Sequence, residues 1–278
     1  MASLSIISAG TMSTVQAIEN CDVTQQSVLD SYSARLANLL VSNPLDTGVI
    51  EMTFSGIQAL FDSDSVISLT GADMEPTLNG EPILMYTSVE VHGGDVLSMK
   101  NARSGLRCYL AVSGGFDIEP EGQRLCAGQV IPLCRKVTLY AIGKRSVPCE
   151  NAFTDTFTLR LTFDTESLVD NTVSELLSRK LTVSKDSDRE HIILNDVSEN
   201  TASLPNLEID VLSGACTCDG RAAGSVISAD FTFLAQVRAG SVVALERVSL
   251  KEALRLERKQ ARRFKLLQYK FLCASWHF

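Results

Sequence analysis

The 278-residue sequence predicts a mostly β protein with a few helices, an α+β chain of two β-barrel-like subdomains followed by a C-terminal helix. Short runs of strand-forming residues, bounded by turn residues, dominate from Gly48 onward. A short motif occurs at 91–97, 125–131 and 237–243, and in each case an apolar residue is followed by a glycine turn and then by two adjacent apolar residues. Its irregular spacing excludes a solenoid and is typical of barrel-like β domains.

One helix is expected in the N-terminal half, between residues 27 and 41. Leucines and a tyrosine recur there at helical spacing on one face. Asn43-Pro44 ends the pattern, because the residue before a proline avoids helical angles. The segment before this helix is predicted to form a strand at 3–9 and a polar turn at 11–16.

Strands are expected next at 48–54, 65–69, 89–91, 96–99, 108–112 and 137–142, with a loop at 70–73. Asn79-Gly80 predicts a two-residue hairpin that joins Thr77-Leu78 to a strand at 83–85. Pro82 restricts that pairing to a sheet edge, since proline has no N–H for a central ladder.

The strand at 108–112 lies between two turn signals. Arg103-Ser104-Gly105 predicts a turn before it, and Gly114-Gly115 predicts a sharp exit after it. Loops held by a rigid sheet often carry function, so this exit is a candidate site; a purely structural turn is the alternative.

A polar stretch at 146–155 predicts a linker, which divides the chain into 1–145, the linker at 146–155, 156–250, and a basic C-terminal helix or tail at 251–278. Thr156–Phe163 alternates apolar and polar residues as a half-buried strand does. Thr172 and Glu175 form a capping-box pattern for a short helix that ends near Arg179. Further strands are expected at 181–184, 192–194, 207–212, 225–227 and 241–248, and a helix at 249–272.

The net charge of −8 is unevenly distributed. Residues 251–270 hold eight Lys/Arg and two Glu, a local charge of +6, which leaves −14 elsewhere. An acidic body argues against nucleic-acid binding. Because neither a signal peptide nor a membrane-spanning stretch is visible, we expect a cytoplasmic protein. We expect the eight cysteines to be reduced thiols, as in most cytoplasmic proteins. Neither the Cys216/Cys218 pair nor the three histidines indicate a metal site.

Spacing alone reveals no nucleophile, metal or phosphate-binding motif. Polar loops at 11–16, 71–73, 113–117 and 186–189 are the candidates for a site. A charged residue in such a loop is more often an ordinary surface residue. The residues by themselves therefore predict a two-domain, mostly β protein and no reaction.

Seven short motifs nevertheless point to a known family, and they occur along the chain in this order: Ser13–Gln16, Asp30 with Arg35–Pro44, Leu69–Asp73, Arg103–Asp117, Thr182–Arg189, Ser225–Phe231 and Val248–Ala253. Together they resemble the bacterial family that includes the C subunit of 5-oxoprolinase, allophanate hydrolase subunit 2 and the carboxyltransferase domain of urea carboxylase. Because the motifs keep their order over nearly the whole chain, the sequence is identified as a divergent member of this family.

The resemblance implies a carboxyltransferase-like subdomain A at 1–145 and a cyclophilin-like subdomain B at 156–250. It also implies ATP as cofactor, 5-oxoproline as substrate and a partner like the B subunit of 5-oxoprolinase, in ATP-dependent opening of 5-oxoproline to glutamate. In urea carboxylase, the related domain passes a carboxyl group from carboxybiotin to urea. The site residues that the resemblance implies are Asp30, Asp188 and Arg189 for catalysis, and Thr14, Gln16, Asp73, Gly114, Gly115 and Asp117 for binding.

The sequence departs from the family pattern mainly in loops. The segments at 17–20 and 26–29 lose the family's residues, the loop after Asp117 is nearly absent, and Glu190-His191 replaces a Met-Gly pair. The glycine-rich segment before Ser225 is shortened to 214–224. Because active sites need donors at fixed positions, two hypotheses remain open. The chain is either part of an enzyme complex or a non-catalytic scaffold that binds a B-subunit-like partner.

Overall fold

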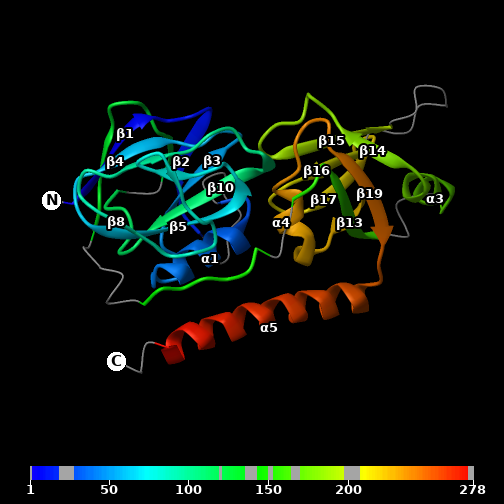
Figure 1. Cartoon of the computed structure of the whole chain (residues 1–278). Helices are drawn as coiled ribbons and strands as arrows, with labels where there is room; N and C mark the ends of the chain where they lie inside the picture. The colour runs from blue at the N-terminus through cyan, green and yellow to red at the C-terminus, as the bar shows by residue number, and fades with distance from the viewer. Residues whose placement is uncertain are drawn as a thin grey trace. The chain divides into compact units, whose positions relative to one another are not determined.

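The computed structural model describes residues 2–18, 28–118, 121–134, 143–149, 153–163, 170–196 and 207–274. The chain divides into two compact units, residues 1–153 with 267–278, and residues 154–266 (Figure 1). The fold is mostly β with a few helices, as predicted. Among the described residues, no helix is both long and apolar enough to cross a bilayer.

The described strands of the first unit form two sheets. One sheet has the order β12-β1-β4-β9-β6-β7, and the other has the order β11-β2-β3-β10-β5-β8. The strands of the first sheet are β1 (Ser3–Ser8), β4 (Gln58–Phe61), β6 (Thr77–Leu78), β7 (Glu81–Pro82), β9 (Val96–Ser98) and β12 (Val130–Pro132). Those of the second are β2 (Met12–Gln16), β3 (Val49–Thr53), β5 (Ser65–Asp73), β8 (Val89–Val91), β10 (Ser104–Val112) and β11 (Glu121–Arg124).

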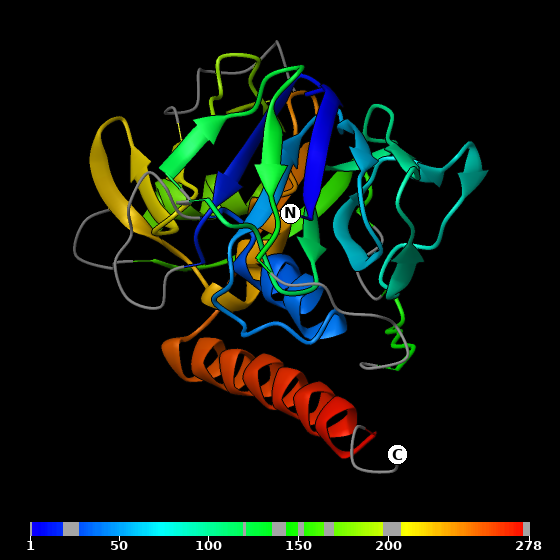
Figure 2. The ribbon, with the colours of Figure 1, turned by 90° about the vertical axis from the view of Figure 1, so that its left-hand side faces the viewer.

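The main core of the first unit combines apolar residues from both sheets. Ile6 and Phe61 from the first sheet join Met52 and Leu110 from the second, all at most 2% exposed. The opposite face of the second sheet packs against α1 (Ser31–Leu40), the blue helix in Figure 2. Tyr109 of β10 shares this second core with Ala34 and Ala37 of the helix. The second sheet is therefore covered on both faces.

Two of the predicted loops are strands, and the turn predicted at 103–105 is largely one as well, because β10 already begins at Ser104. The predicted turn at 11–16 is β2, paired with β3 on one side and β11 on the other. Its polar residues are buried but satisfied: Ser13 Oγ donates to the Ala9 carbonyl at 2.7 Å, and Gln16 Nε2 donates to Thr14 Oγ1 at 2.9 Å. Likewise the predicted loop at 70–73 belongs to β5. Pairing with neighbours from distant sequence overrode the local turn propensity.

The Asn79-Gly80 hairpin is confirmed, because β6 and β7 pair directly across it and both turn residues have positive φ. β7 lies at the sheet edge, as Pro82 predicts. The predicted strand at 83–85 is wrong, since β7 already ends at Pro82. The predicted strand at 137–142 lies outside the described residues.

The described strands of the second unit form a closed barrel with the order β13-β18-β17-β16-β15-β14-β19. Their bounds are β13 (Thr156–Phe163), β14 (Lys180–Val183), β15 (His191–Asp196), β16 (Leu207–Asp210), β17 (Ala215–Cys218), β18 (Arg221–Val226) and β19 (Val242–Arg247). The alternation of β13 is confirmed, with Phe157, Leu159 and Leu161 buried. The closed barrel agrees with the barrel predicted for this half of the chain.

Helices flank the strands of the second unit. They are α3 (Asp170–Ser178), a 3-10 turn (Ser228–Asp230), α4 (Phe231–Leu234) and α5 (Leu250–Ala274). The capping-box prediction misplaced the start of α3, because the helix already includes Asp170. In α5, Ala253 and Leu256 pack on Ile227 and Ala229. The C-terminal part of α5 belongs to the first unit, where the Phe271 ring lies 5.3 Å from the Arg145 guanidinium.

Candidate functional site

The candidate site begins where the end of β5 lies beside the start of β10. Asp73 and Ser104 are directly opposite each other across this strand pair. The register shifts between Ser104 and Cys108, close to Gly71, which has φ +88°. A Cβ at Gly71 would lie 2.4 Å from the Arg107 carbonyl oxygen. Only glycine allows the strands to approach this closely while the backbone is left-handed.

Tyr86 closes the free edge of β5 next to this pair. β8 pairs only with Ser65–Ile67 of β5. Beyond that point Tyr86 supplies the hydrogen bonds to the edge of β5, and its backbone N–H donates to the Leu69 carbonyl at 2.7 Å. The Tyr86 hydroxyl donates to the Gly71 carbonyl at 2.9 Å and accepts from the Gly71 N–H at 3.1 Å. Burial, followed by nearby Cys149 and Asp30, raises the pKa of this phenol well above its usual range. Tyr86 is therefore a neutral structural clamp at the floor of the site.

A cavity of about 580 Å³ opens above this clamp, entirely within the first unit. Its polar lining consists of Asp73, Glu75, Thr77, Lys100 and Ser104. Its remaining wall is mainly apolar and is formed by Gly71, Pro76, Pro82, Ile83, Leu84, Met85, Tyr86, Cys149 and Phe153. A concave, mostly apolar site with a few convergent polar groups is the usual form of a small-molecule site.

Three polar groups of the lining have complementary chemistry. The Asp73 Oδ1 accepts from the Glu75 N–H at 3.0 Å, so its carboxylate is held at the end of β5. Ser104 supplies a hydroxyl from the neighbouring strand. Lys100 Nζ lies 3.7 Å from a Glu75 carboxylate oxygen, and both side chains are largely solvated. The cavity thus offers an acceptor, a donor and a cation to one ligand.

Of the residues that the resemblance implies, only Asp73 lines this cavity. Asp30 instead caps α1, where its two carboxylate oxygens accept from the Ser33 N–H at 3.0 Å and the Ser33 hydroxyl at 2.6 Å. Asp30 is 1% exposed. Thr14 and Gln16 are buried in β2, with Thr14 directly opposite Glu51 of β3.

The glycine-rich exit of β10 is a tight turn away from the cavity lining. Gly114 and Gly115 both have positive φ, and the Gly114 N–H donates to Asn43 Oδ1 at 2.8 Å. A Cβ at Gly115 would lie 2.7 Å from Thr47 Cγ2. Asp117 follows as an exposed residue whose N–H donates to the Pro132 carbonyl at 2.8 Å. The turn predicted from the two glycines is confirmed.

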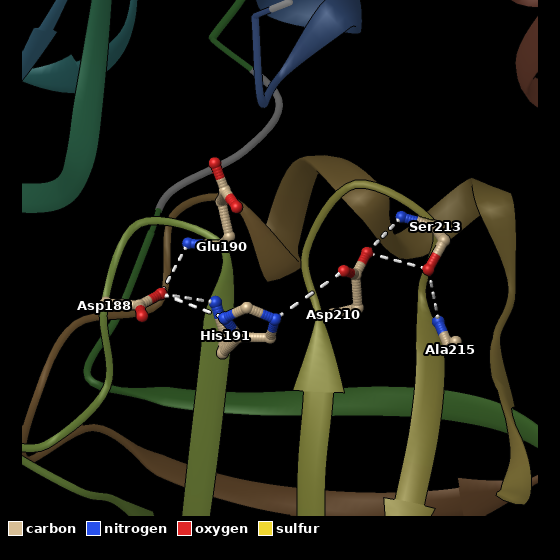
Figure 3. Close-up of polar contacts among 6 residues, drawn as sticks. All are labelled: Asp188, Glu190, His191, Asp210, Ser213 and Ala215. Carbon is tan, nitrogen blue, oxygen red and sulfur yellow. Dashed lines mark hydrogen bonds and ion pairs between the residues drawn. The ribbon is translucent and has the colours of Figure 1, made fainter. Parts of the chain in front are cut away.

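Asp188 and Arg189 lie in the loop between β14 and β15 of the second unit, and Figure 3 shows Asp188 beside His191. Asp188 Oδ1 accepts from the Glu190 N–H at 2.8 Å and the His191 N–H at 2.7 Å, so it closes its own loop. The His191 ring lies between two carboxylates, 3.4 Å from Asp188 and 4.0 Å from Asp210. Partial burial would raise the pKa of Asp188, but these N–H donors and the imidazole lower it below its usual value.

The Cys216/Cys218 pair lies on β17 with both thiols buried. Burial raises the pKa of Cys216 to about 12 and raises that of Cys218 as well. Both are therefore protonated, unreactive thiols. Among the described residues, no group of three His, Cys, Asp or Glu side chains is arranged to hold a metal ion.

Of the residues that line the cavity, sequence reasoning singled out only Gly71 and Asp73 as part of a candidate site; Glu75, Tyr86, Lys100, Ser104 and Cys149 are among those that it missed. Tyr86 carried a weak signal, because this tyrosine lies between two predicted strands and belongs to the apolar pattern of neither. Lys100 and Cys149 carried none, because only the folded chain brings them to Asp73.

The model of the carboxyltransferase domain, subdomain A and B, matches residues 22–218. The chain belongs to this family. It is 26% identical over 320 aligned positions to the C subunit of 5-oxoprolinase from Escherichia coli, an alignment that covers 96% of this chain and 98% of that protein. It is 41% identical over 90 residues to urea amidolyase of Saccharomyces cerevisiae, but these are 32% of this chain and only 5% of that protein.

The fold agrees with this assignment. The urea carboxylase of Kluyveromyces lactis superposes with a TM-score of 0.78 and 20% identity, over 95% of this chain and 29% of that one. The chain thus corresponds to a small part of the urea-metabolising relatives and to nearly the whole of the 5-oxoprolinase relative. This family member therefore aligns over nearly its whole length with the 5-oxoprolinase C subunit of Escherichia coli.

Proposed function

We propose that this family member acts as the C-subunit-like component of an ATP-dependent 5-oxoprolinase, together with a B-subunit-like partner. The end-to-end alignment with the Escherichia coli protein supports this role. The substrate would bind in the cavity of the first unit, and ATP binding by the assembled complex is part of the proposal.

The chemistry of the cavity carries the proposal. 5-Oxoproline has a lactam N–H, a lactam carbonyl and a carboxylate. Asp73 can accept from the N–H, the Ser104 hydroxyl can donate to the carbonyl, and the Lys100 ammonium can donate to an oxygen of the carboxyl group. Asp73 and Ser104 are neighbours across one strand pair, so they can bind adjacent atoms of one amide.

The reaction adds one water across the lactam C–N bond and gives glutamate. The Asp73 carboxylate is a group of the type that positions or deprotonates such a water. Catalytic roles for Asp30, Asp188 and Arg189, and binding roles for Thr14, Gln16, Gly114, Gly115 and Asp117, remain predictions.

The test is to purify the chain with a B-subunit-like protein and measure ATP-dependent formation of glutamate from 5-oxoproline. We expect Asp73→Asn to lower kcat/KM by about tenfold or more, because a hydrogen bond to a charged group is lost. Asp46→Asn, an exposed carboxylate of the same unit outside the cavity, should keep full activity. Asp188→Ala and Arg189→Ala test the second-unit loop. Equal activity of Asp73→Asn and the parent would refute this use of the cavity, and turnover of urea with carboxybiotin instead would favour a related carboxyltransferase complex.

A second candidate is a non-catalytic scaffold that binds a B-subunit-like partner. The observation that favours it is the structural use of two surviving carboxylates: Asp30 caps α1 and Asp188 closes its own loop. This alternative predicts a stable complex with the partner and no turnover of 5-oxoproline.

A further inference from the structure

The cavity around Asp73 is much larger than the ligand that the proposed function assigns to it. 5-Oxoproline is a single five-membered ring with one carboxyl group. A volume of about 580 Å³ lies in the range that encloses drug-sized ligands. A ring held by Asp73 and Ser104 therefore leaves most of the cavity empty, and this remaining space needs an explanation.

The space beyond the polar groups has an apolar wall. Ile83, Leu84 and Met85 follow the edge strand β7, and Phe153 joins them from the end of the first unit. Leu84 is 74% exposed, the highest value among the large exposed hydrophobic residues of the described chain. An apolar group in this space would cover Leu84 and remove its side chain from water, which favours binding.

The backbone around the cavity is held in an unusual conformation. Glu75 has φ 47° and Tyr86 has φ 58°, both left-handed for residues other than glycine. Such conformations persist only where the surrounding structure imposes them, and they occur often at ligand sites. Here they bracket the segment 76–85, which supplies most of the apolar wall.

The charges of the lining favour a neutral amide over a free carboxylate. The described lining contains two carboxylates, Asp73 and Glu75, and one ammonium, Lys100, which lies 3.7 Å from Glu75. The carboxylate of free 5-oxoproline would compete with Glu75 for Lys100. A neutral amide carbonyl at the same position can accept from Lys100 without that repulsion.

From the size, the apolar wall and the charges, we infer that the site takes 5-oxoprolyl amides whose amine part is apolar, in preference to free 5-oxoproline. The inference rests on the proposed function, because it keeps the 5-oxoproline ring between Asp73 and Ser104. The amide carbonyl faces Lys100, and the apolar amine part lies along Ile83, Leu84 and Phe153.

Three probes test the inference by isothermal titration of the full chain: 5-oxoproline, 5-oxoprolinamide and 5-oxoproline N-benzylamide. The two amides are both neutral and differ only in the benzyl group. We expect the benzylamide to bind at least about tenfold more tightly than 5-oxoprolinamide, because the benzyl group buries apolar surface. Free 5-oxoproline should bind no more tightly than its amide.

Two variants locate the effect. Leu84 is exposed, so Leu84→Ser should leave the fold intact. This variant should bind the benzylamide severalfold more weakly and 5-oxoprolinamide as tightly as the parent does. Val130→Ser, at an exposed residue of β12 outside the cavity, should change neither. If both amides bind equally, or if Leu84→Ser weakens both alike, the inference is wrong while the proposed function stands. If none of the three probes binds, the proposed use of the cavity fails and the inference fails with it.

Discussion

The Tyr109 hydroxyl donates to a Glu51 carboxylate oxygen at 3.0 Å, and both side chains are buried inside the first unit. The same hydroxyl accepts from the Asp30 N–H at 2.9 Å, and Glu51 accepts from the Leu29 N–H at 3.0 Å. The segment that starts α1 is thereby tied to β3 and β10. Burial, followed by the nearby Glu51 and Asp30 carboxylates, raises the pKa of Tyr109 well above its usual range, so the phenol keeps its proton.

Tyr109→Phe should therefore destabilise the first unit by about 1–3 kcal/mol, because it leaves a buried N–H and a buried carboxylate without their shared hydroxyl. Urea denaturation followed by circular dichroism measures the loss. Tyr269→Phe removes a hydroxyl from a tyrosine that is 63% exposed and should change the stability by less than about 0.5 kcal/mol. Equal effects of the two substitutions would contradict the role of the Tyr109 hydroxyl.

Gly71→Ala should cost about 2–4 kcal/mol, since it combines a left-handed backbone with an overlap against the Arg107 carbonyl. Gly80→Ala is the matched control, because Gly80 has nearly the same φ and no atom within 4 Å of its added Cβ. It should show only the conformational part, about 1–2 kcal/mol. Thermal denaturation of both variants separates the two contributions, and a Gly71→Ala protein as stable as Gly80→Ala would rule out the close contact.

Asp188 should titrate with a pKa below 3.8, the usual value for its carboxyl group. A folded pKa below the unfolded one means that ionised Asp188 stabilises the fold above pH 3.8, and that this stabilisation disappears as the pH falls through the folded pKa. His191→Gln removes the imidazole but keeps the backbone donors, so it should shift the pKa of Asp188 part of the way back up. Carboxyl-carbon NMR titration measures the shift. His92→Gln, in the first unit, should leave it unchanged; an identical Asp188 titration in all three proteins would show that the imidazole has no effect.

Local patterns predicted the elements whose structure depends on neighbouring residues. The alternation of Thr156–Phe163 gave a correct strand because one face of β13 is buried, and Asn79-Gly80 gave a correct hairpin because both residues tolerate positive φ. The same reasoning failed for Met12–Gln16, where polar residues lie in a buried strand. Their hydrogen bonds are satisfied by local partners and by pairing with β3 and β11, which the segment's own composition does not reveal.

The sequence by itself determined the family, the order of the main elements and the candidate residues, because motifs in chain order need no three-dimensional information. Only the tertiary structure decided what those residues do. Asp30 became a helix cap because α1 begins directly after it, and Asp73 became part of a cavity because β10 places Ser104 opposite it. Residues 31 positions apart meet only through strand pairing, and no local pattern in the sequence specifies that pairing.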